Sequence, residues 1–388
     1  MSADIINFKV NEDRLIQTFM DLVKITSPSK SERLVADYLV NYLNNLGLEL
    51  TEDNAGKKLG GNCGNLYCRV PATQQGAIPF AILTHMDTVV PCENTQPVLK
   101  DGVISVTSPT VLGADDKAGI AEVLELITVL IENQLPHGEI ELVFTISEET
   151  YMHGARNLDV SWFHSKYALI LDEQGAPGVI INQAPYLYTL NVTVHGKAAH
   201  AGMCPEDGIN AIQMASRAIS LMTLGRLDDE TTANIGLIQG GFARNIVPNS
   251  VYIEGESRSL NRDKVIAQVQ HMETCFKTAA EELKGTVTLD IQESFPGYEV
   301  PKDCEFIQML VSATEQTGLK SVIRHSGGGT DANVLNKKGI QSVVLSMGFR
   351  DMHTVLEHVF VEDLHKTVLW LNNIQYQLSQ ELWIKRLT

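Results

Sequence analysis

The stretch Ala81-Ile-Leu-Thr-His-Met-Asp-Thr88 decides the fold that this sequence predicts. Its first four residues are apolar or β-prone, which is typical of the end of a buried strand. His85 and Asp87 follow, and residues two apart in a strand point to the same side. We therefore expect both side chains to project from a strand end, where α/β sheets carry their sites. A neutral imidazole binds zinc well and a neighbouring carboxylate can orient it, whereas the alternative is two solvated polar residues.

The composition narrows the class of protein. A chain of 388 residues is long enough for two domains. Its formal net charge of −17 argues against nucleic acid or an anionic membrane surface as a partner. We expect no membrane span and no signal peptide, because the sequence lacks the apolar runs that either would need. Six scattered cysteines without a CxxC pair predict reduced thiols and a cytoplasmic location.

Helices and strands alternate over the first part of the chain. Apolar spacing predicts a helix over 11–25, and the capping-box pattern Ser29-Lys-Ser-Glu32 predicts the start of a second helix. Residues 89–111 are expected to form a polar loop, followed by a helix over about 120–131. Strands are expected at about 48–52, 64–70, 79–83, 139–146 and 168–171. This alternation predicts an α/β domain with a mixed sheet.

The pattern changes near residue 186. Residues 186–194 alternate in polarity as a half-exposed antiparallel strand does, and a β-α-β-β-α-β order of ferredoxin-like type follows. The α/β pattern resumes afterwards. We therefore expect a discontinuous first domain over 1–186 and 297–388, with an inserted α+β domain over 187–296.

Polar side chains follow several of the predicted strands. Converging carboxylates could not all stay ionised without a counter-charge, and bound dications supply one. Histidines and carboxylates together suit two zinc ions that share a carboxylate, roughly 3.5–4 Å apart, whereas solvated acids on loops are the alternative. The residues are His85, Asp87, Asp115, Asp116, Glu148, Glu149, Asp172 and His353.

Three further features have two interpretations each. Glu148 and Glu149 would face opposite sides of an extended strand, which suits one metal ligand and one group facing the activated water better than a glycosidase pair. The backbone of Gly327-Gly-Gly-Thr-Asp331 could hold an anion or form a tight turn. Arg258 could bind a substrate carboxylate or remain a solvated charge.

Six motifs together resemble the cocatalytic two-zinc metallopeptidase family, which contains peptidase T, carboxypeptidase G, aminoacylase and desuccinylases. The resemblance covers essentially the whole chain, and residues 112–121 look closest to peptidase T. The motifs are Thr84-His-Met-Asp87, Gly113-Ala-Asp-Asp-Lys117, Ser147-Glu-Glu149, His195-Gly-Lys-Ala-Ala-His-Ala-Gly202, Gly328-Gly-Thr-Asp331 and Met352-His-Thr-Val-Leu-Glu357.

The resemblance implies two divalent metal ions. Zn²⁺ is the expected ion, and Co²⁺ or Mn²⁺ can occupy similar sites. Asp115 would bridge the two ions. Glu149 would join His85 on one ion, and His353 would join Asp172 on the other.

The resemblance also implies a reaction. Asp87 would orient a metal-binding histidine, and Glu148 would be the general base for a metal-bridging water. The implied function is hydrolysis of amide bonds in short peptides, with a tripeptide aminopeptidase favoured. An N-acyl amino acid amidohydrolase or carboxypeptidase on the same scaffold is one alternative, and a non-catalytic binding protein is another.

The inserted domain matches the lid of this family, which is also its usual dimerisation surface. The resemblance therefore implies a homodimer through the lid. His200 would stabilise the oxyanion, from the neighbouring subunit. Arg258, Asn245 and the backbone around Gly328 would bind a substrate carboxylate.

Overall fold

The computed structural model describes residues 8–387, and these fall into two units. The first unit contains the chain up to Gln183 and again from Glu299, and the second contains Ala184–Tyr298. The chain therefore leaves the first unit once and returns to it.

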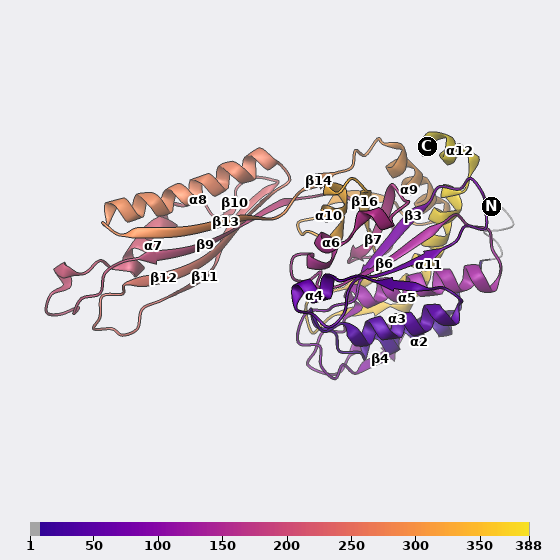
Figure 1. Cartoon of the computed structure of the whole chain (residues 1–388), viewed down its shortest axis with the longest axis horizontal. Helices are drawn as coiled ribbons and strands as arrows, with labels where there is room; N and C mark the ends of the chain where they lie inside the picture. The colour runs from indigo at the N-terminus through magenta and orange to yellow at the C-terminus, as the bar shows by residue number, and fades with distance from the viewer. Residues whose placement is uncertain (1–7, 388) are drawn as a thin grey trace. The chain divides into compact units, whose positions relative to one another are not determined.

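A mixed nine-stranded sheet forms the centre of the first unit (Figure 1). Its middle strands β6, β3, β7 and β16 run parallel, so their carboxyl ends meet at one edge of the sheet. The order is β1 (Leu50–Glu52), β2 (Leu66–Val70), β6 (Ile140–Thr145), β3 (Phe80–His85), β7 (Tyr167–Glu173), β16 (Gln341–Ser346), β8 (Val179–Ala184) and β14 (Tyr298–Glu299), with β15 (Val322–His325) paired to β8.

Helices cover this sheet and bury its central strands. Every residue of β3 and β6 is buried, as expected for parallel strands covered on both faces. Helix α5 (Ala114–Glu132) packs against β3 and β7, and α10 (Asp331–Lys337) packs against β7 and β16. The other helices of this unit are α2 (Glu12–Val23), α3 (Arg33–Asn45), α4 (Ala55–Leu59), α6 (His153–Asn157), α9 (Glu305–Gln316), α11 (Val361–Leu378) and α12 (Glu381–Leu387).

The prediction of a loop over 89–111 is wrong. Strands β4 (Pro97–Lys100) and β5 (Val103–Val106) form a hairpin there, joined to β18 (His358–Phe360) and β17 (Phe349–Arg350) in a second sheet. The hairpin turn is Asp101-Gly102, and both residues have positive φ, 53° and 77°. Asp-Gly between two short strands is a strong hairpin signal, and it was available in the sequence.

The capping-box prediction at Ser29–Glu32 is also wrong. Helix α3 begins at Arg33, and its N-cap residue Glu32 makes no side-chain cap bond. The Glu32 carboxylate instead accepts bonds from the amides of Lys30 and Ser147, while Ser29 Oγ donates to the Asp87 carboxylate. Both residues therefore support a distant loop rather than a helix end.

The second unit is an antiparallel sheet with two helices. Its strand order is β10-β11-β12-β9-β13, in which β9 lies between β12 and β13 as in ferredoxin-like sheets. Helices α7 and α8 pack on each other and on this sheet, with Val192, Ile253 and Phe276 in the shared core. The bounds are β9 (Tyr186–His195), α7 (Ala211–Leu221), β10 (Gly225–Arg226), β11 (Thr231–Gly240), β12 (Ser250–Ser259), α8 (Arg262–Glu282) and β13 (Thr286–Phe295). Across the described residues, no helix combines the length and apolarity that crossing a bilayer requires.

Candidate metal centre

The predicted metal ligands gather at the carboxyl edge of the central sheet. His85 is the last residue of β3, and Asp172 lies near the end of β7. Glu149 lies just beyond β6, and Asp115 stands in the first turn of α5. His353 comes from the loop between β17 and β18, so segments far apart in sequence supply one site.

At this edge of the sheet, two groups of side chains are close enough to hold a metal ion, and Asp115 belongs to both. In the first group, His85 Nε2 lies 3.1 Å from Asp115 Oδ1 and 3.7 Å from Asp172 Oδ1. In the second, His353 Nε2 lies 3.1 Å from Asp115 Oδ2 and 3.2 Å from Glu149 Oε1. Each oxygen of Asp115 therefore faces a different group, as a bridging carboxylate must.

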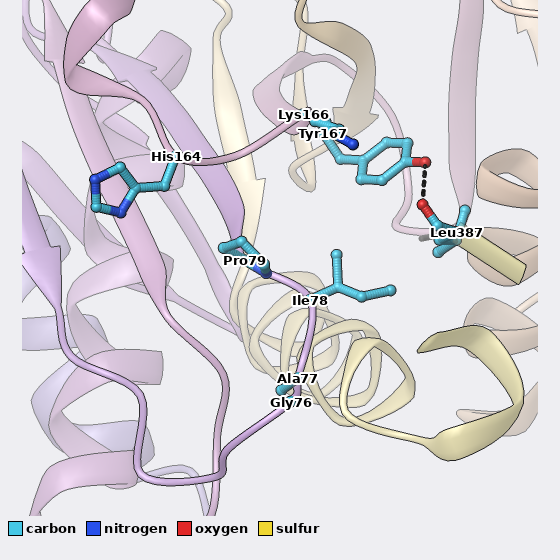
Figure 2. A pocket seen from close by; sticks show the side chains of 8 residues that line it. All are labelled: Gly76, Ala77, Ile78, Pro79, His164, Lys166, Tyr167 and Leu387. Atoms are coloured by element: carbon cyan, nitrogen blue, oxygen red, sulfur yellow. Dashed lines mark hydrogen bonds between the residues drawn. The ribbon is translucent and has the colours of Figure 1, made fainter. Parts of the chain in front are cut away.

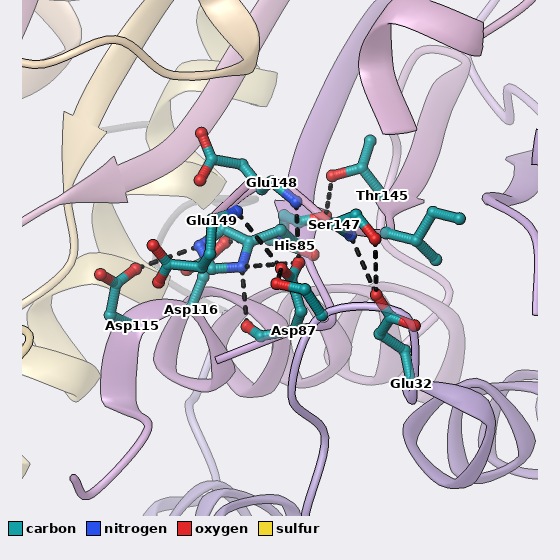
Figure 3. A network of polar contacts seen from close by, with 12 residues as sticks. Glu32, His85, Asp87, Asp115, Asp116, Thr145, Ser147, Glu148 and Glu149 are labelled. Carbon is teal, nitrogen blue, oxygen red and sulfur yellow. Dashed lines mark hydrogen bonds and ion pairs between the residues drawn. The ribbon is translucent and has the colours of Figure 1, made fainter. Parts of the chain in front are cut away.

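The predicted division of the ligands between the two ions is wrong. The sequence-based assignment placed Glu149 with His85 and His353 with Asp172. The structure instead groups Asp172 with His85 and Glu149 with His353. The reason is the strand order, because β3 and β7 are direct neighbours in the sheet. Figure 3 shows the Asp115 carboxylate joined to the His85 ring by a dashed line.

The electrostatics of the site fit bound dications. Burial raises the pKa of Asp172, and burial together with Asp172 raises the pKa of Glu148. Burial acts on Asp115 in the same direction, but hydrogen bonds from His353 and His85 outweigh it and lower the pKa of that carboxyl. Buried carboxylates that repel one another need positive charge nearby. The set of one histidine and two carboxylates in each group is a donor set that binds such ions well.

Asp87 contacts both the His85 ring and the turn that follows β6. The His85 ring is oriented by a hydrogen bond between Nδ1 and the backbone carbonyl of Asp87, at 2.9 Å. The Asp87 carboxylate lies 3.6 Å from the same ring nitrogen. It also accepts bonds from the amides of Glu148 and Glu149, at 3.0 and 3.2 Å, and from Ser29 Oγ at 2.6 Å. These bonds hold the turn after β6, as the dashed lines in Figure 3 show.

The turn after β6 separates the roles of its two glutamates. Ser147 has a positive φ of 50°, so the strand has ended before Glu148 and Glu149. The Glu149 carboxylate belongs to the second ligand group, whereas the Glu148 carboxylate belongs to neither. Glu148 is only 8% exposed. A buried carboxyl group that lies beside a metal site but does not serve as a ligand suits a general base.

Sequence reasoning assigned no role to several buried groups around the ligands. Glu357 accepts hydrogen bonds from the amides of Gly113 and Asp115. Asp331 accepts a bond from Thr145 Oγ1 at the end of β6, and burial raises its pKa to about 6. Lys117 donates to the Ile25 carbonyl, and burial lowers its pKa to about 8. Each of these three residues is the last residue of one of the six family motifs, and that position was the one sign in the sequence of a role at the site.

The predicted substrate-binding residues have partners of their own. Arg258 on β12 makes two hydrogen bonds to the Glu256 carboxylate, at 2.9 and 3.1 Å. Asn245 lies in the loop between β11 and β12, where its carbonyl accepts a bond from the Ala201 amide. The Gly328 amide donates to Ser326 Oγ, so this amide would have to exchange partners to bind an anion.

His200 has one ring nitrogen engaged. Its Nδ1 lies 3.2 Å from the Gly202 amide and 3.1 Å from the Met203 amide, and both amides donate to it. A ring nitrogen that accepts hydrogen bonds carries no proton, so the neutral ring carries its proton on Nε2. His200 is therefore a hydrogen-bond donor through Nε2 and is exposed in the second unit.

A third cluster, Glu139, Glu141 and His164, does not resemble the first two. Arg69 lies within 3.6 Å of both carboxylates and supplies positive charge. Glu141 already accepts bonds from Tyr67, from the His164 amide and from Ser165. His164 also lines a cavity of about 160 Å³ where β3 and β7 begin, at the opposite end of these strands from the site (Figure 2).

Comparisons with known proteins agree with this fold. The model of the M20 peptidase dimerisation domain matches residues 186–284, and the model of peptidase family M28 matches residues 65–174. An uncharacterized Bacillus subtilis protein, YqjE, is 41% identical over 92% of this chain and 96% of its own length. Peptidase T from Listeria welshimeri is 26% identical, over 92% of this chain and 96% of its own.

Solved structures give the same result. Aminopeptidase PepT from Bacillus cereus is 40% identical, with a TM-score of 0.89, and the match covers 96% of this chain and 100% of that one. A tripeptidase from Staphylococcus aureus is 36% identical, with a TM-score of 0.92, and the match covers 95% and 99%.

The mixed α/β sheet and the two ligand groups at its edge define a metallopeptidase that binds two divalent metal ions. More narrowly, the chain belongs to the M20 family of two-metal peptidases and stands close to peptidase T. The family and the fold class predicted from the sequence are thereby confirmed.

Proposed function

We propose that this protein is a tripeptide aminopeptidase that uses Glu148 as its general base. The observation that carries the proposal is the pair of ligand groups that share Asp115, with the Glu148 carboxylate buried beside them and part of neither. The similarity to an aminopeptidase PepT and to a tripeptidase supports the substrate class. We propose residues 1–186 and 297–388 as the catalytic domain and residues 187–296 as the lid.

The chain's residues have separate tasks in this proposal. His85, Asp115 and Asp172 would hold one divalent ion, and Asp115, Glu149 and His353 would hold the other; Zn²⁺ is proposed for both.

When bound, such ions polarise a carbonyl and acidify a water. Glu148 would take a proton from the attacking water and pass it to the leaving amine. Asp87 would hold the Glu148 and Glu149 backbone in place.

The lid unit supplies the second part of the proposal. His200 would donate a hydrogen bond from Nε2 to the oxyanion. Its Nδ1 accepts the Gly202 and Met203 amides, which fixes the ring for this purpose. Arg258, Asn245 and Gly328 would bind the substrate carboxylate after exchanging their present partners. We also propose a homodimer through the lid. The match to a dimerisation domain supports it. Strand β11 does so as well, because the short edge strand β10 pairs with it only at Ala233 and Thr232.

An amine-release assay tests the substrate class. The protein is loaded with Zn²⁺ or Co²⁺ and given Ala-Ala-Ala, Ala-Ala, N-acetyl-Ala-Ala-Ala and N-acetyl-alanine, with a chelator control and the E148A variant. We expect chelator-sensitive release from the free tripeptide only. Preference for the acylated substrates would move the protein to the deacylase or carboxypeptidase branch, and no turnover on any of them would contradict peptidase function.

Mixing two inactive variants tests whether His200 acts across a dimer. E148A lacks the base, and H200A lacks the oxyanion donor. If His200 serves the neighbouring subunit, each mixed dimer contains one complete site, so random mixing should restore about a quarter of the wild-type activity. No recovery after proven subunit exchange would show that His200 acts within its own chain. A fully active monomer would contradict the dimer itself.

The location is a further part of the proposal. All six cysteines are free thiols, which suits a reducing compartment. We therefore propose that the protein works in the cytoplasm, on short peptides and without nucleic acid or membrane partners.

A further inference from the structure

Glu357 links two chain segments that carry metal ligands of the second group. One segment carries Asp115, which both groups share, and the other carries His353. Its side chain is 1% exposed, and both carboxylate oxygens are engaged. Oε2 accepts the Gly113 amide at 2.7 Å, and Oε1 accepts the Asp115 amide at 3.0 Å. These residues lie 244 and 242 positions away in the sequence. One side chain therefore connects the loop of His353 to the backbone of Asp115.

The segment from His353 to Glu357 is internally braced. Thr354 Oγ1 donates to the Asp351 carbonyl at 2.7 Å and accepts the Leu356 amide at 3.1 Å. The Glu357 amide donates to the Thr354 carbonyl at 3.2 Å. Because these bonds restrain the loop, holding Glu357 in place also restrains the backbone of His353, four residues earlier.

The backbone at both ends of this connection has a positive φ. His353 has a φ of 63°, in the left-handed region that non-glycine residues rarely adopt. Gly113 has a φ of 75° and lies against Thr88, where a Cβ atom would come within 3.1 Å of a methyl group. Glycine adopts such a φ freely, whereas the strained conformation of His353 persists only where its surroundings hold it, and Glu357 provides bonds to both segments.

The Glu357 bond and the ligand contact join the same two segments. His353 Nε2 already lies 3.1 Å from Asp115 Oδ2 through the ligand group itself. Two links between the same segments fix their separation and also their relative rotation. A ligand pair held in this way loses less conformational freedom when it binds an ion.

We propose that Glu357 is a positioning residue for the metal centre, which sets Asp115 and His353 at the separation that the second ion requires. The inference rests on the proposed function, because it assigns metal binding to those two residues. Glu357 itself neither touches the ion nor exchanges protons with the substrate. Its contribution is to tie the loop that carries His353 to the backbone amides of Gly113 and Asp115.

The test compares E357Q with a matched control, E141Q. Glu141 is also fully buried and accepts two backbone amides, those of His164 and Ser165, but it lies at the opposite end of β6 from the site. Both proteins are stripped with a chelator and titrated with Zn²⁺ by calorimetry. Co²⁺ absorption spectra and urea unfolding of the metal-free proteins are measured in parallel.

We expect both variants to lose stability, and only E357Q to bind one of the two ions about 10–100-fold more weakly, with a changed Co²⁺ spectrum. Equal metal affinity in E357Q, E141Q and the wild type would overturn the inference, as would an equal loss in both variants. E357D provides a second variant if E357Q does not fold, because it retains the charge but is too short to reach both amides. A wild-type protein that binds no dication would instead contradict the proposed function, so the two failures are distinguishable.

Discussion

Replacing Asp87 with asparagine tests how the site is held together. The buried Asp87 carboxylate accepts the Glu148 amide at 3.0 Å, the Glu149 amide at 3.2 Å and Ser29 Oγ at 2.6 Å. In D87N, one oxygen can still accept the Glu148 amide. The NH₂ group that replaces the other oxygen is a donor, and it faces the N–H of Glu149.

The magnitude follows from this count of bonds. One buried N–H loses its acceptor, which costs about 1–3 kcal/mol, and one charge-assisted bond becomes a neutral one, which costs about 1 kcal/mol more. Ser29 can rotate its hydroxyl and accept from the new NH₂ group, so it adds little. We expect the free energy of unfolding to fall by about 2–4 kcal/mol. Because the same amides carry Glu148 and Glu149, kcat should fall about 10–100-fold.

Two measurements and one control separate positioning from stability. Urea unfolding of the chelator-treated protein gives the stability loss, and amine release from the tripeptide gives kcat. The E141Q variant loses comparable bonds at the far end of β6, so it should be destabilised but retain wild-type kcat at temperatures where it is folded. A D87N enzyme with normal kcat would refute the reasoning, and so would an equal fall of kcat in E141Q.

Three further predictions concern the base, its pH dependence and the thiols. E148A should retain both metal ions but lose about 10²–10⁴-fold in turnover, and metal loss measured in that variant would show that Glu148 is a ligand. Because burial raises the pKa of Glu148, and because a base must be ionised, kcat/KM should fall with decreasing pH through a value above 4.5; a limb at or below pH 4.5 would contradict this assignment. Burial raises the pKa of Cys63 and of Cys68 to about 12, so native protein at pH 8 should react with a thiol reagent quickly only at the partly exposed Cys204 and Cys304. Six fast equivalents would contradict the described packing.

Strands with a regular polarity pattern could be predicted from the sequence alone. The apolar strand before His85 and the alternation over 186–194 are periodic signals, and both segments are strands in the structure. Where a turn signal was overlooked, as at Asp101-Gly102, the hairpin was missed although the residues that form it were visible. The Ser29–Glu32 pattern failed for the opposite reason. Its hydrogen bonds go to Asp87 and Ser147, which compete successfully with the local cap.

The sequence by itself determined the family, the mixed α/β class and the set of side chains offered to the metals, because motif order and period are properties of the chain. Only the tertiary structure decided which ligands share an ion. That depends on β3 lying beside β7, a neighbour relation between segments that local spacing does not encode. The same holds for Glu357, whose partners lie 242 and 244 residues away. Contacts at such separations leave no periodic signal, so their geometry exists only after the sheet and its loops have been assembled.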